Sequence, residues 1–139
     1  MKYTHNQKAI LLFKEYTHHK NYKSSSFSEL LKHYMTCKKM NNSSLSLILG
    51  ISPSYISSLT NEDPFEEIRH STKLIVAICI ALNLPPCMSY NLLHLAGCDL
   101  LNNSKDRAYD FLLNYYYNSS LEECNNILTA LGQLPLTKY

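Results

Sequence analysis

Histidine and cysteine side chains are the first candidates for chemistry in this chain, because they can bind metals or act as bases and nucleophiles. Two groups of them lie close together in the sequence: His5, His18 and His19, and Cys87, His94 and Cys98. Neither group has the ligand spacing of a closed tetrahedral zinc site, and the five cysteines contain no CxxC pair. We therefore expect no metal, no cofactor and reduced thiols.

Acidic side chains are the second candidates, because paired carboxylates can act as general acid and base. Four of them fall within residues 62–67, and His70 is the only histidine near them. The sequence contains no Gly-rich phosphate loop, no G-x-S-x-G elbow and no HExxH motif. These patterns favour a protein that is not an enzyme.

Hydroxyl and amide side chains are the third candidates, and they are concentrated in residues 42–61 around a pattern typical of two short helices joined by a steep turn. Such a turn needs a small residue, a glycine with positive φ and apolar anchors. Ser46 is the small residue and Gly50 the glycine. The apolar anchors are Leu45, Leu49, Ile51, Ile56 and Leu59. The pattern predicts a helix-turn-helix unit with its turn at residues 49–51.

Further helices must hold this pair in place. Apolar periodicity and capping residues predict helices over about residues 27–37, 43–49, 53–59, 72–82 and 88–96. The segment from Leu74 to Leu82 is apolar nearly all round, which suits the centre of a core. We therefore predict five helices between residues 25 and 98.

One helix is expected before this set and two after it. The first, over about residues 6–18, has an apolar stripe of Ala9, Leu12, Phe13 and Tyr16. The last two, after Ser104 and Ser120, predict a hairpin packed on the rest through Tyr115, Tyr116 and Tyr117. The expected fold class is all-α. The expected units are an N-terminal helix with its linker (1–24), a helix-turn-helix domain (25–98) and a C-terminal helical hairpin (99–139).

The segment from Leu45 to Leu59, LSLILGISPSYISSL, resembles the helix-turn-helix of the Xre/Cro (phage-repressor-like) transcriptional regulators of bacteria and phages. The order of five helices from Phe27 to Ala96 resembles the whole domain of that family. Residues 106–110 and 120–128 are similar to an extension found in one bacterial branch. The resemblance covers about residues 27–136, and it implies a repressor-like five-helix domain.

This resemblance implies that the second helix of the pair, Ser52–Leu59, enters the major groove of DNA. The candidate DNA-binding residues are Lys38, Lys39, Asn42, Ser52, Pro53, Ser54, Tyr55, Ser57, Ser58 and Asn61. The recognition helix departs from the family by having no Arg, Lys, Gln or Asn, which are the strongest readers of bases. The acidic loop that follows it would repel phosphates if it faced the DNA.

The charge of the chain is unevenly distributed. Residues 1–40 carry eight lysines against Glu15 and Glu29, whereas residues 41–70 and 71–139 are both slightly acidic. A basic first third favours an anionic partner such as nucleic acid. The longest apolar run has nine residues, where a membrane span needs about 20. We expect a cytoplasmic protein without a membrane partner.

Together these features predict a sequence-specific DNA-binding transcriptional regulator, a repressor that binds double-stranded DNA as a homodimer. Two-fold pairing is expected because one short helix reads too few base pairs for useful affinity. The dimer contact would come from the N-terminal helix or the tail hairpin. The alternative is a protein-interaction module on the same fold, such as an antitoxin or a phage-type inhibitor, with weak or no DNA binding.

Overall fold

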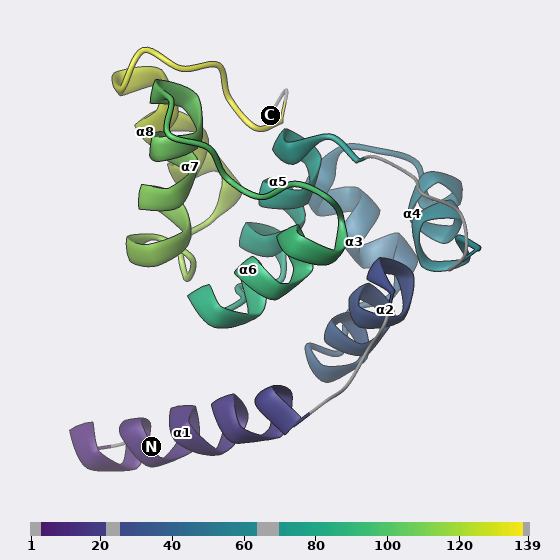
Figure 1. The fold of residues 1–139 in the computed structure, drawn as a ribbon, viewed down its shortest axis with the longest axis vertical. Coiled ribbons are helices and arrows are strands. Elements are labelled where there is room, and N and C mark those ends of the chain that lie inside the picture. The colour runs from purple at the N-terminus through teal and green to yellow at the C-terminus, as the bar shows by residue number, and fades with distance from the viewer. Residues whose placement is uncertain (1–3, 22–25, 64–69, 138–139) are drawn as a thin grey trace.

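The computed structural model of this chain describes residues 4–21, 26–63 and 70–137, with the backbone alone for residues 18–21. The described residues form eight α-helices and no β-strand, so the expected all-α class is confirmed (Figure 1). The helices are α1 (His5–Asn21), α2 (Phe27–Cys37), α3 (Asn42–Leu49), α4 (Pro53–Thr60), α5 (Thr72–Ala81), α6 (Pro86–Leu95), α7 (Ser104–Tyr115) and α8 (Leu121–Ala130).

Short polar side chains fix where most of these helices begin. In six of them the residue before the first turn accepts a hydrogen bond from the backbone N–H three positions later, which satisfies a donor that the helix itself leaves unpaired. These caps are Ser26, Asn41, Ser52, Ser71, Asn103 and Ser120. α1 has a reciprocal cap, in which Thr4 and Gln7 each accept from the other's backbone N–H.

α5 lies at the centre of the core, as its apolar sequence predicts. Every residue from Ile75 to Leu82 is buried, and α5 packs against α3, α6, α7 and α8. α2 packs on α4 and α6 through Leu30, Leu31 and Tyr34. The helices α2 to α6 therefore enclose one hydrophobic core, which extends into α7 and α8.

α1 differs from the rest. Its apolar stripe of Ala9, Leu12, Phe13 and Tyr16 is exposed, and Figure 1 shows α1 projecting from the body of the molecule below α2 and α6. Among the described residues, an ion pair between Lys38 Nζ and Glu15 Oε1, 3.0 Å apart, links α1 to the body. The apolar face of α1 is thus open to solvent within this chain.

The C-terminal hairpin packs on the body, but not through the side chains we expected. Tyr115 and Tyr116 are exposed and only Tyr117 is half-buried, so the expectation of packing through all three tyrosines is wrong. The buried contacts come instead from Leu112, Leu113 and other apolar residues on the opposite faces of the hairpin. α7 ends at Tyr115, and both Tyr115 and Tyr116 lie on the outer side of the hairpin.

The residues after α8 return to the body and lie beside the turn between α3 and α4. The buried Asn125 ties these residues to α8, because its Oδ1 accepts from the backbone N–H of Leu136 at 2.8 Å and its Nδ2 donates to Thr137 at 2.9 Å. Leu136 is buried. Within the described residues, none of the helices combines the length and apolar character that crossing a membrane requires.

Candidate nucleic-acid interface

The turn between α3 and α4 is built around Gly50, which adopts φ +70°, a left-handed conformation that side-chain-bearing residues rarely adopt. Its backbone N–H donates to Ser46 O at 2.8 Å, and the N–H of Ile51 donates to the same oxygen at 3.2 Å. Ser46 is buried where the two helices approach, and its Oγ donates to Ser43 O. The positive φ predicted for Gly50 is confirmed.

α4 is anchored on one side and open on the other. Ile56 and Leu59 are buried against the core, as expected. Pro53, Ser54 and Ser58 are exposed on the outer side, and Tyr55 is 48% exposed. The structure therefore leaves four of the predicted DNA-binding side chains accessible along one short helix.

The polar groups of this outer side are already hydrogen-bonded locally. Ser58 Oγ donates to Tyr55 O at 2.6 Å, and Ser52 Oγ and Ser54 Oγ lie 3.1 Å apart. Asn61 Nδ2 donates to Ser57 O at 2.9 Å, so these two predicted residues bond to each other. A hydroxyl that donates to the backbone keeps lone pairs that can accept a further hydrogen bond. The outer side of α4 can therefore accept from base amino groups without losing its own bonds.

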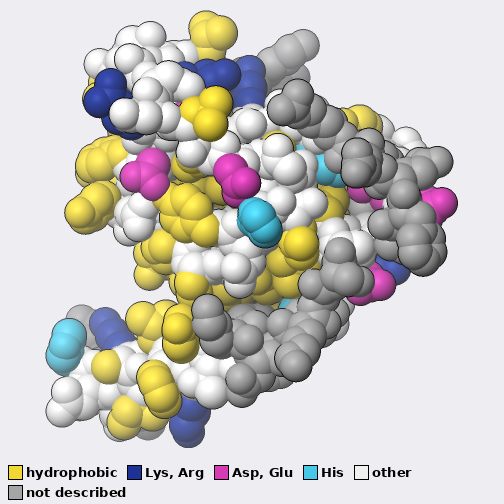
Figure 2. Space-filling view, in the orientation of Figure 1, with side chains coloured by type: hydrophobic (Ala, Val, Ile, Leu, Met, Phe, Trp, Pro, Cys, Tyr) yellow, Lys and Arg dark blue, Asp and Glu magenta, His cyan; other side chains and the backbone are white. Residues whose placement is uncertain are grey.

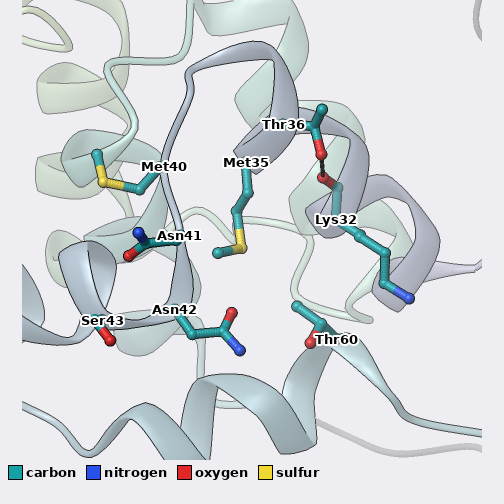
Figure 3. A pocket seen from close by; sticks show the side chains of 8 residues that line it. All are labelled: Lys32, Met35, Thr36, Met40, Asn41, Asn42, Ser43 and Thr60. Carbon is teal, nitrogen blue, oxygen red and sulfur yellow. Dashed lines mark hydrogen bonds between the residues drawn. The ribbon is translucent and has the colours of Figure 1, made fainter.

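A hollow of about 570 Å³ lies beside α4, where the start of α3 meets α2 (Figure 3). It is lined by Lys32, Met35, Thr36, Met40, Asn41, Asn42, Ser43 and Thr60. Asn41 is turned toward its own helix, since its Oδ1 accepts from the N–H and Oγ of Ser44. Asn42 extends its amide toward Thr60 in Figure 3. The hollow thus places an amide at the positive end of the α3 dipole, a suitable place for a phosphate.

Three lysines lie in the segment that leads into this hollow. Lys32 lines it from α2 and is exposed. Lys39 is exposed and adopts φ +54°, whereas Lys38 is paired with Glu15. α3 and α4 contain no basic residue of their own, so the positive charge beside the interface comes from α2 and the residues after it. Of these lysines, our sequence analysis did not select Lys32.

The acidic residues after α4 are partly directed away from this side. Glu62 Oε2 is 3.1 Å from His70 Nε2, and both side chains are largely buried. The His70 ring also packs on Phe27, with 4.4 Å between ring centroids. Asp63 is exposed, while Glu66 and Glu67 lie outside the described residues. The pairing with His70 removes Glu62 from the surface that would face a phosphate backbone.

Apolar side chains also appear on the outer side of α3, which our sequence analysis did not single out. Leu47 is 83% exposed and Ile48 is partly exposed. Leu47 is two positions from both buried leucines, Leu45 and Leu49, which places it on the opposite face of the helix, whereas Ile48 lies at the edge of the buried face. A solvent-exposed leucine beside the turn can contact the methyl groups of thymine in DNA or an apolar surface of another protein.

The thiols of the core are kept protonated. Burial raises the pKa of Cys79 to about 12 and that of Cys124 to about 11. None of the five cysteines forms a disulfide. Among the described residues, no three His, Cys, Asp or Glu side chains converge as metal ligands would.

Comparisons of the chain with protein-family models, with curated proteins and with solved structures give no match. The geometry of α3, α4 and their surroundings is therefore the guide to the function of the chain.

Proposed function

We propose that this chain is a sequence-specific DNA-binding transcriptional regulator of the Xre/Cro type, a repressor that acts as a homodimer and has no catalytic role. In this proposal α2 to α6 form the repressor-like domain, and α4 enters the major groove of double-stranded DNA. The observation that carries the proposal is the pair α3 and α4. It combines a left-handed Gly50, a buried Ser46 and an accessible outer side on α4.

Two further features support this function. The hollow at the start of α3 offers Asn42 and Lys32 to a phosphate, which would fix the position of the protein on the duplex. Ser54, Ser58 and Tyr55 would then meet base edges. The hydroxyls would accept from adenine or cytosine amino groups, and the Tyr55 ring and Leu47 would contact thymine methyl groups. Such an interface would recognise the DNA sequence through several base contacts that are each weak.

A gel-shift titration on the DNA upstream of the protein's own gene, at two salt concentrations, tests the proposal. We expect Tyr55→Ala to weaken specific binding by about 5- to 150-fold, since a lost base contact costs about 1–3 kcal/mol. Lys32→Gln should weaken binding to all sequences and reduce the salt slope by about 1. Tyr115→Ala is the matched control, because Tyr115 is exposed on α7, outside the α3 and α4 pair.

Specific affinity near the non-specific level at physiological salt, with Tyr55→Ala indistinguishable from Tyr115→Ala, would contradict the proposal. The second candidate function, a protein-interaction module, would then replace it. Exposed Leu47, Ile48 and Tyr55 and the absence of basic residues in α3 and α4 favour this alternative. Its test is a pull-down in which Leu47→Asp loses a partner that Leu101→Asp, an exposed control, retains.

A further inference from the structure

A pocket on the inner side of the turn between α3 and α4 has no part in the proposed contact with DNA. It has a volume of about 440 Å³ and lies between this turn, the first turns of α5 and the residues after α8, which return toward α5 in Figure 1. It shares no lining residue with the hollow at the start of α3. Ligand pockets in proteins have volumes of about 300–1,000 Å³, so this one suits a small organic molecule.

The walls of this pocket are apolar and come from three separate segments of the chain. They are Leu49 and Ile51 from the turn, Leu74 and Ala77 from α5, and Leu136 from the residues after α8. Three of these side chains are buried and belong to the hydrophobic core, namely Leu49, Ala77 and Leu136. Packing in the core therefore holds the walls in place before any ligand binds, which lowers the cost of binding.

The wall formed by the residues after α8 is fixed as firmly as the other two. The buried Asn125 accepts from the backbone N–H of Leu136 and donates to Thr137, which also lines the pocket. These bonds join the wall to α8, which packs on α5. The third wall is therefore a tied segment that can support a ligand.

Polar donors lie at the mouth of the pocket. Lys73 is the only charged residue that lines it, is exposed, and takes part in none of the ion pairs among the described residues. Ser71 Oγ accepts from the N–H of Leu74 at 3.4 Å, which leaves its own proton available to donate. Figure 2 shows Lys and Arg side chains at the end of the molecule where the residues after α8 lie. The mouth therefore suits an anionic group.

A single ammonium group also limits the charge of the ligand. One lysine balances one negative charge, whereas a phosphate monoester carries about −1.5 to −2 at neutral pH. A carboxylate has the single charge that Lys73 can neutralise, and it accepts from both an ammonium and a hydroxyl group. The apolar walls require that the rest of the ligand be apolar too.

We propose that this pocket binds a small carboxylate with an aliphatic body, and that the bound ligand holds the turn between α3 and α4 in the geometry seen here. The carboxylate pairs with Lys73, and the aliphatic body contacts Leu74, Ala77 and Leu136. Because Leu49 and Ile51 form one wall, the ligand also contacts the turn that orients α4. A ligand raises the population of the conformation that it binds best, and this conformation leaves the outer side of α4 accessible.

The ligand therefore acts as a corepressor that strengthens DNA binding. This regulatory step rests on the proposed function, whereas the binding of the carboxylate does not. The two parts are tested by separate measurements.

An NMR titration of the full chain, labelled with ¹³C at its methyl groups, tests the site. The probe is octanoate; octylamine has the same aliphatic chain with the opposite charge, and acetate has the carboxylate without the chain. We expect octanoate to shift the methyl signals of Leu74, Ala77 and Leu136 until they saturate, and the other two compounds to leave them unchanged at the same concentrations. The methyl signals of Leu101, which is exposed outside the pocket, should not move.

Lys73→Glu reverses the charge at the mouth and leaves the core intact, because Lys73 is exposed. We expect its affinity for octanoate to fall by about 2- to 30-fold, since an exposed ion pair is replaced by a repulsive pair of similar strength. Octylamine should now shift the methyl signals of the pocket. Lys105→Glu is the matched control, because it makes the same charge change at an exposed lysine of α7 that does not line the pocket.

Three results would each overturn the proposed site. They are pocket methyl signals that octanoate does not shift, equal binding of octanoate and octylamine to the wild type, and equal affinity of Lys73→Glu and Lys105→Glu for octanoate.

Gel shifts with and without octanoate test the regulatory step. We expect octanoate to tighten specific DNA binding of the wild type and of Lys105→Glu by about fivefold or more, and to have a smaller effect on Lys73→Glu. Unchanged or weaker DNA binding of the wild type in octanoate would overturn this step. A wild type without specific DNA binding in either condition contradicts the proposed function, and the methyl signals still decide whether the site exists.

Discussion

α1 and α5 are both helices with apolar centres, yet the structure places them in opposite environments. α5 is buried from Ile75 to Ala81 and contacts four other helices, whereas the apolar residues of α1 face solvent. An apolar run therefore predicts that a helix will be covered, but not whether its own chain provides the cover. For α5 the partners come from this chain, whereas the described residues of this chain leave the apolar side chains of α1 exposed.

The largest difference between the two helices should appear when one isoleucine in each is truncated. Ile78 is fully buried, so Ile78→Ala should lower the free energy of unfolding by about 2–5 kcal/mol, through lost burial and the cavity left behind. Ile10→Ala, measured where the chain is monomeric, should change it by less than about 0.5 kcal/mol. Urea denaturation followed by circular dichroism measures both. Equal losses would show that α1 is packed on its own chain in solution.

The caps of the two helices give the next difference. Ser71 accepts from the N–H of Leu74 at the start of α5, so Ser71→Ala should destabilise the whole fold by about 1 kcal/mol. Thr4→Ala removes the corresponding acceptor from α1. It should reduce helical signal at low concentration without changing the denaturation midpoint of the body. A midpoint shift in Thr4→Ala as large as that in Ser71→Ala would contradict the separation of α1 from the core.

The contrast also shows what could be predicted from the sequence. The helices α2 to α6 were predictable because their signals are local: capping residues at Ser26, Ser52 and Ser71, a glycine at the turn and apolar periodicity. The N-terminal helix was also predicted, although it is longer at both ends than expected. Its Thr4 and Gln7 cap was present in the sequence as the pattern T-x-x-Q, which could have fixed its start.

Contacts between distant segments were not predictable in this way. The ion pair of Glu15 with Lys38, the clamp of Asn125 on residues 136–137 and the pair of Glu62 with His70 each depend on how separate segments meet. The hollow beside α4 likewise combines the ends of three helices, which explains why Lys32 was not selected. The expected boundary near residue 24 falls among residues outside those described.

The smallest expected effect concerns the ion pair between Glu15 and Lys38, which joins α1 to the body. Burial and the negative charge of Glu15 both raise the pKa of the Cys37 thiol, while Lys38 lowers it. Glu15→Gln removes the carboxylate and leaves Lys38 free to stabilise the thiolate. At a pH below the thiol pKa, the thiolate fraction rises as the pKa falls, so alkylation of Cys37 should become faster.

The rate of iodoacetamide labelling at Cys37, followed by peptide mass spectrometry at several pH values, measures this effect. The stability should change by less than about 1 kcal/mol, because the pair is partly exposed. Cys79 provides the internal control, since its burial and raised pKa of about 12 should keep it unlabelled in both proteins until they unfold. Unchanged labelling of Cys37 in Glu15→Gln would mean that α1 does not rest beside α2 in solution.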